Sequence, residues 1–165
     1  MRYATTIVLS GFAAAPALAA SGSVSVTIPR LPVAEYHKPY VAIWLEQPGQ
    51  PARTVAVWYS PKGEAREPGT KWLADIRTWW RKGGRSLALP ADGISGATRG
   101  PGVHKVALPL NGLAPGAYTL NVEAAREVGG RELVSLPFTL PARGGQSRRA
   151  AGRTELGAVA LDIKP

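Results

Sequence analysis

The 165-residue sequence contains no cysteine and only two histidines, His37 and His104. The absence of cysteine excludes a disulfide framework, thiol catalysis and any zinc or iron–sulfur centre held by cysteine. Two distant histidines do not supply a multi-histidine metal site. We therefore expect no metal centre, and we expect both histidines to lie on the surface or in loops without a catalytic role.

Other signatures of hydrolytic enzymes are also absent. The sequence has no Gly-x-Ser-x-Gly segment, which would position a nucleophilic serine on a sharp turn. The acidic residues Glu123, Glu127 and Glu132 fall in or between segments with strand character, and we expect them to be solvated charges rather than a pair of catalytic acids. The sequence therefore predicts no catalytic residues and no self-sufficient enzyme.

Positive charge exceeds negative charge without forming a basic helix. Twenty Lys and Arg residues against eleven Asp and Glu give a formal net charge of +9. The positive residues are scattered, with local clusters at Arg77, Arg81, Lys82 and Arg85 and at Arg148 and Arg149. Nucleic-acid binding needs a concentrated basic surface, so we expect no nucleic-acid partner.

Long apolar runs are missing except at the N-terminus, which has the pattern of an export signal. Arg2 gives a positive start, an apolar stretch follows, and Ala17-Leu18-Ala19 has the small-x-small pattern of a cleavage site. We expect residues 1–19 to be removed after Ala19. The mature chain, residues 20–165, is then a single domain exported to the periplasm.

Short strands dominate the rest of the chain. Glycine (19) and proline (15) are frequent, and apolar residues alternate with polar ones between turns. A turn at residues 47–51 predicts an antiparallel hairpin of residues 40–45 with 54–59. Seven strands are predicted, at residues 24–28, 40–45, 54–59, 103–110, 117–126, 132–140 and 155–163. Their number favours a mainly-β, immunoglobulin-like antiparallel sandwich.

Three segments depart from the strand pattern. Apolar residues recur at helical spacing from Trp72 to Trp80, which predicts one amphipathic helix with Thr70 as its N-cap and Gly83-Gly84 at its end. We expect most of the five tryptophans to be core residues, with one of Trp79 and Trp80 partly exposed. Residues 90–102 and the basic segment 143–153 are predicted to be loops.

One segment has a recognisable chemical pattern, Asp92-Gly93-Ile94-Ser95-Gly96-Ala97-Thr98. It resembles the acceptor motif of covalently flavinylated proteins, Asp-x-x-Ser/Thr-Gly-Ala-Ser/Thr. In those proteins, a periplasmic flavin transferase takes FMN from FAD and links its phosphate to the last hydroxyl residue. The resemblance implies that Thr98 is the acceptor and that Asp92, Ser95, Gly96 and Ala97 form the recognition frame.

The residue types suit such an attachment. Gly96 and Ala97 have almost no side chain, so the backbone can approach a bulky nucleotide. Arg99 follows the acceptor and could pair with the phosphodiester charge. An ordinary Gly-rich turn, in which Asp92 and Ser95 cap local amides, is the alternative interpretation of the same residues.

Longer blocks resemble two known groups of proteins. NGLAPGAYTLNVEA resembles a hairpin of immunoglobulin-like secreted modules. Six further blocks resemble a family of predicted periplasmic proteins, domain of unknown function 2271. They are PYVAIWLE, VAVWY, KWLADIRTWWRKG, DGISGATRGPG, GAYTLNVEAAREVGG and ELGAVALDI. That resemblance implies association with a flavin transferase and with membrane redox proteins of the PepSY type.

Two functions follow from these observations. The first is a periplasmic electron carrier with covalent FMN on Thr98, in which the protein supplies attachment and electrostatic tuning. The second is a cofactor-free periplasmic binding or assembly module that uses its immunoglobulin-like fold. Colour and fluorescence that survive denaturation would distinguish the two.

Overall fold

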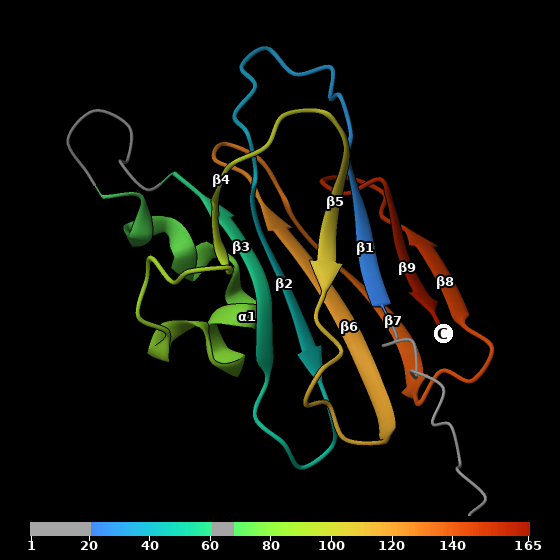
Figure 1. The fold of residues 1–165 in the computed structure, drawn as a ribbon. Helices are drawn as coiled ribbons and strands as arrows, with labels where there is room; N and C mark the ends of the chain where they lie inside the picture. Colours follow the sequence, from blue (N-terminus) through green and yellow to red (C-terminus); the bar gives the residue numbers. More distant parts are fainter. Residues whose placement is uncertain (1–20, 61–67) are drawn as a thin grey trace, which may run out of the picture.

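Two β-sheets form the framework of the computed structural model, which describes residues 21–60 and 68–165 (Figure 1). One sheet has the order β5-β1-β9-β8 and the other the order β4-β3-β2-β6-β7. The strands are β1 (Ser21–Ile28), β2 (Tyr40–Glu46), β3 (Arg53–Tyr59), β4 (Ser95–Ala97), β5 (Gly102–Leu108), β6 (Gly116–Ala125), β7 (Arg131–Leu140), β8 (Gln146–Ala151) and β9 (Ala158–Lys164). The predicted signal peptide lies outside the described residues.

The main core lies between the two sheets. Alternate residues of each strand point inward, so Val24 and Val26 of β1 share one apolar cluster with Val41 and Ile43 of β2. At the start of β6, the Tyr118 hydroxyl donates a hydrogen bond of 2.7 Å to the carbonyl oxygen of Ala114. This tyrosine corner is typical of immunoglobulin-like sandwiches. The predicted fold class is confirmed, as is the predicted hairpin of β2 with β3.

A second core covers the outer face of the five-stranded sheet. Trp44 of β2 and Val57 of β3 are buried there against the helical segment, which contributes Leu73, Ile76 and Trp79. Figure 1 shows this segment beside β2 and β3. The middle strands are therefore buried on both faces, which explains their nearly continuous apolar sequences.

The helical segment is not the continuous helix that the sequence predicted. A 3₁₀ helix, η1 (Gly69–Asp75), is followed by a short α-helix, α1 (Arg77–Lys82), and a further 3₁₀ turn, η2 (Gly84–Ser86). Ile76 separates η1 from α1 with ψ 71°, and Thr70 is not the N-cap. Gly83 does end α1, as predicted.

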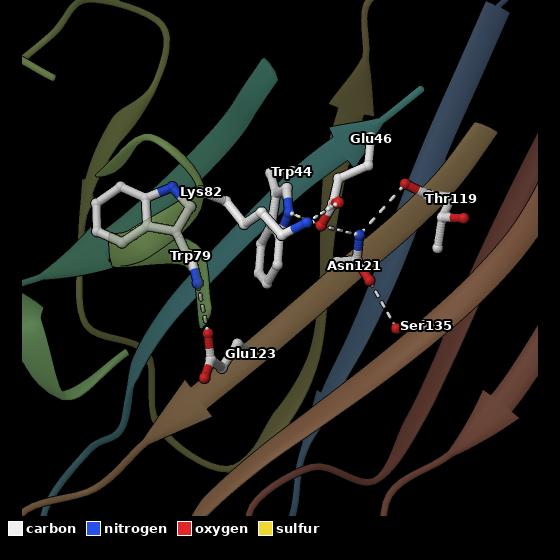
Figure 2. Close-up of polar contacts among 8 residues, drawn as sticks. All are labelled: Trp44, Glu46, Trp79, Lys82, Thr119, Asn121, Glu123 and Ser135. Atoms are coloured by element: carbon white, nitrogen blue, oxygen red, sulfur yellow. Dashed lines mark hydrogen bonds and ion pairs between the residues drawn. The ribbon is translucent and has the colours of Figure 1, made fainter. Parts of the chain in front are cut away.

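A buried carboxylate explains this break. Glu123 of β6 is fully buried and accepts hydrogen bonds from the backbone amides of Thr78 (3.1 Å) and Trp79 (2.9 Å). Helix residues near an N-terminus have no intrahelical acceptor for these amides, and Glu123 supplies one. The prediction that Glu123 is a solvated charge is therefore wrong. Figure 2 shows the contact of Glu123 with Trp79.

A polar band continues from Glu123 along the same face of the sheet (Figure 2). Glu46 accepts hydrogen bonds from Trp44 (2.9 Å) and Lys82 (2.8 Å), and Asn121 lies within 3.3 Å of the same carboxylate. Burial raises the pKa of Glu46, but the hydrogen bonds from Lys82 and Trp44 outweigh it and hold the pKa below its ordinary value. The band joins α1 to β2 and β6.

Two strands lie in segments that the sequence predicted to be loops. β8 is an edge strand paired with β9 in the basic segment, and β4 lies within residues 90–102, paired in parallel with β3. β8 was missed because most of its side chains are exposed, so its sequence has no apolar alternation. β4 has only three residues, too few for a periodic pattern.

Glu132 is the other acidic residue whose predicted setting was wrong. It is partly buried, and its carboxylate accepts hydrogen bonds from the backbone amides of residues 153–156, among them Thr154 (3.0 Å) and Leu156 (2.9 Å). The carboxylate therefore fixes the turn that precedes β9.

Candidate cofactor site

A tight turn positions the motif next to β3. The backbone amide of Ser95 donates to the carbonyl oxygen of Ala91 (2.9 Å), and the amide of Ala91 donates to the Ser95 hydroxyl (2.9 Å). Gly93 adopts φ +71°, which favours glycine. The Ser95 hydroxyl thus caps a local amide, as the ordinary-turn interpretation expected, while Asp92 is exposed.

β4 then runs parallel to β3 with Gly96 opposite Trp58. A Cβ atom at Gly96 would lie 3.4 Å from Cδ1 of Trp58, which is an ordinary contact distance. Packing therefore does not require glycine at this position. Ala97 is exposed, and the two small residues leave the backbone accessible immediately before Thr98.

Arg99 lies against an aromatic ring. Its guanidinium carbon is 4.2 Å from the centre of the Trp58 ring, a cation–π contact. His104 of β5 contacts the same indole edge to face at 5.8 Å and bonds through Nε2 to the carbonyl oxygen of Gly100 (2.8 Å). The Trp58 side chain therefore holds the segment that follows Thr98.

Thr98 itself is half-buried and lines a cleft of about 990 Å³, which we call the Thr98 cleft. The volume is within the range of small-molecule sites. The cleft is formed by five stretches of chain that are separate in sequence. Its lining residues are Tyr36, His37, Lys38, Tyr40, Ser60, Trp72, Asp75, Arg77, Thr98 and residues 125–131.

Cations outnumber acids around the Thr98 cleft. The lining includes Lys38, Arg77, Arg126 and Arg131 but only two acidic residues, Asp75 and Glu127. Which of these cations a ligand could use depends on the partners that they already have.

Two of these four cations are already bound to buried carboxylates. Arg126 donates to both oxygens of Glu155 at 2.8 and 3.1 Å, and this bond raises the pKa of the Arg126 guanidinium. Arg131 pairs with the buried Glu123. Lys38 and Arg77 form no ion pair within residues 21–60 and 68–165. They are the cations most available to a ligand.

Aromatic and apolar groups complete the lining. Trp72 is 46% exposed, whereas Trp44, Trp58 and Trp79 are buried and Trp80 is half-buried, as expected for one of the adjacent pair. Val128, in the turn between β6 and β7, is 82% exposed and has φ 52°. His37 lies between Glu35 (3.0 Å) and Glu127 (3.5 Å), close to this turn.

The structure thus brings Thr98 to a cleft that sequence analysis did not foresee. Of the motif residues, it places Thr98 on the cleft lining, Ser95 in the turn, Gly96 and Arg99 against Trp58, and Asp92 and Ala97 at the surface. No pattern in the sequence pointed to Tyr36, Arg126 or Arg131. The one available signal was the charged and glycine-containing stretch of residues 126–130, which separates two segments with strand character.

Comparison with known proteins adds a family. The profile of the DUF2271 family, described as a predicted periplasmic protein, matches residues 21–158. The chain belongs to this family. No curated protein and no solved structure shows significant similarity to it.

The DUF2271 match supports a periplasmic location, as the family description states. In the part of the chain that the structure describes, no helix has the length and apolar character needed to cross a membrane.

Proposed function

We propose that this DUF2271 protein is a periplasmic electron carrier that bears one FMN in phosphoester linkage to Thr98. The observation that supports it is the location of Thr98: the hydroxyl residue that ends the motif lines a cleft large enough for a cofactor. The resemblance to flavinylated proteins rests on the motif residues alone. The cleft adds a space of cofactor size next to the acceptor residue.

The residues of the Thr98 cleft fit the chemistry of a flavin nucleotide. Lys38 and Arg77, which form no ion pair in the described residues, are available to the charge of a phosphodiester. The exposed indole of Trp72 offers a flat apolar surface for an aromatic ring. FMN, when bound, accepts and returns electrons, and nearby cations favour its reduced, anionic form.

Attachment is a group-transfer reaction in which FAD donates its FMN part to Thr98. The Thr98 oxygen attacks the phosphorus on the FMN side of FAD, a new P–O bond forms, the pyrophosphate bond breaks and AMP leaves. The hydroxyl proton passes to a base of the flavin transferase, which is the catalyst. A membrane redox protein of the PepSY type is the electron-transfer partner that we propose.

Intact mass tests the proposal. The protein is exported with a flavin transferase, FAD and Mg²⁺, and in parallel without the transferase. We expect a mass increase of one FMN minus one water only with the transferase, and yellow colour that survives denaturation. An unmodified mass under both conditions would reject the carrier and leave the cofactor-free binding module as the function.

A further inference from the structure

Tyr36 has a buried polar atom without a partner. Its hydroxyl is inaccessible to solvent, and no group in residues 21–60 and 68–165 forms a hydrogen bond with it. Burial, the largest effect, raises the pKa of the phenol, which is therefore neutral and able both to donate and to accept. Buried polar groups are nearly always bonded in folded proteins, so such an exception points to a missing partner.

Neighbouring protein groups cannot easily become that partner. Arg126 is committed to both oxygens of Glu155, and the Glu155 carboxylate also accepts the amide of Gly130 at 2.8 Å. Breaking these buried hydrogen bonds would leave Arg126, Glu155 or the Gly130 amide unpaired. The free energy lost would exceed what a new bond to Tyr36 returns. Because Tyr36 lines the Thr98 cleft, the partner that fits is a ligand that enters the cleft and reaches the hydroxyl after a small shift of the atoms that cover it.

The lining identifies the kind of ligand. It combines a hydroxyl that can donate or accept with an exposed indole, Trp72, over whose ring Lys71 lies at 5.0 Å. A flat ring with carbonyl and N–H groups on one edge satisfies both features. The pyrimidine edge of a flavin has this alternation of acceptors and donors.

We propose that the Thr98 cleft is a non-covalent seat for the flavin ring, in which Tyr36 binds the polar edge of the ring and Trp72 packs on its face. This rests on the proposed function, since it concerns the cofactor tethered at Thr98. It goes further because it assigns recognition of the ring to residues remote from the motif.

The first experiment needs no attachment. Unmodified Thr98→Ala protein is titrated with riboflavin, which has no phosphate, and binding is followed by quenching of flavin fluorescence. We expect saturable binding that Tyr36→Phe weakens about tenfold, the value of one hydrogen bond of about 1.4 kcal/mol. Tyr118→Phe is the matched control, because it removes the same hydroxyl outside the cleft, and we expect unchanged affinity.

Tyr36→Phe and Tyr118→Phe should also differ in their effect on the Tm of the ligand-free protein. Tyr36→Phe removes a hydroxyl that has no partner, so we expect an unchanged or higher Tm. Tyr118→Phe breaks a real bond to Ala114 and should lower Tm. A lower Tm for Tyr36→Phe would show that its hydroxyl has a protein partner, which would overturn the argument.

The second experiment uses the protein exported with the transferase. We expect Tyr36→Phe to carry the same flavin stoichiometry by intact mass but to show brighter flavin fluorescence than the wild type. Wild-type protein that stays unlabelled rejects the proposed function, whereas riboflavin binding to Thr98→Ala tests the seat separately. Equal riboflavin affinity and equal fluorescence in Tyr36→Phe and wild type would reject the seat.

Discussion

Thr98 differs from its neighbours in the motif because it alone lines the cleft with its side chain half-buried. Thr98→Ala should abolish flavin attachment, since no oxygen remains to form the phosphoester, and Thr98→Ser should retain it. A half-buried position should change stability by no more than about 1 kcal/mol. Peptide mass mapping checks this prediction.

Ser95→Ala is the control for the Thr98 variants. It removes the other hydroxyl of the motif and the cap on Ala91, but it leaves the acceptor in place. We expect flavin still on Thr98, at a reduced yield. Flavin mapped to Ser95 in the wild type would contradict the assignment of the acceptor.

Glu123 is the residue whose loss should cost most stability. Glu123→Ala leaves the amides of Thr78 and Trp79 without acceptors and Arg131 without its partner. Removing one partner of such a buried group destabilises by about 3–5 kcal/mol. Urea denaturation measures the loss, and Glu127→Ala, at an exposed acid in the adjoining turn, should stay within about 0.5 kcal/mol.

Val128 combines a branched side chain with a left-handed backbone, φ 52°. That conformation costs most residues about 1–2 kcal/mol, whereas asparagine tolerates it. Val128→Asn should therefore raise Tm by about 2–4 °C. The same substitution at Val103, which is 65% exposed in β5, should give no gain, and equal effects at both sites would argue against backbone strain.

At the scale of elements, local pattern predicted strands well and the helical segment only in part. The spacing from Trp72 to Trp80 indicates a helix, but the acceptor that separates η1 from α1 is Glu123, 44 positions from Trp79. No local pattern contains that contact. β2 and β3 were predictable because their apolar residues are contiguous and a turn separates them.

The turn before β9 makes stability depend on pH through Glu132. Burial raises the pKa of this carboxyl, but hydrogen bonds from the amides of residues 153–156 outweigh it and the pKa is lowered from 4.5. Its contribution is therefore complete above pH 4.5 and is lost as pH falls through the lowered value. Glu132→Gln should be less stable than wild type at pH 7.

The pH dependence of that difference is the test. Because the wild-type advantage comes from the ionised carboxylate, the gap in the free energy of unfolding should shrink as pH falls below 4.5. Denaturation series at pH 7 and at acidic pH measure it. A gap independent of pH would show that the hydrogen-bond geometry alone, and not the charge, stabilises the turn.

For the whole molecule, the sequence predicted the sandwich but not the cleft. Alternation and turn residues are properties of one strand and its neighbour, so the fold class follows from them. The Thr98 cleft needs Tyr36, Trp72, Thr98 and the β6–β7 turn together, and no periodicity relates these stretches. The acceptor residue could be named from the motif, whereas its surroundings required the structure.

β4 joins the sheet at an edge through only three residues, while its partner β3 is buried on both sides. Short edge elements open with far less free energy than the global unfolding of a domain. We expect the amides of residues 95–97 to exchange with deuterium much faster than those of β2 and β6. Residues 95–98 could then separate from β3 and enter the active site of a transferase while the two sheets stay folded. Equally slow exchange would mean that the flavin must be attached before the exported chain completes folding.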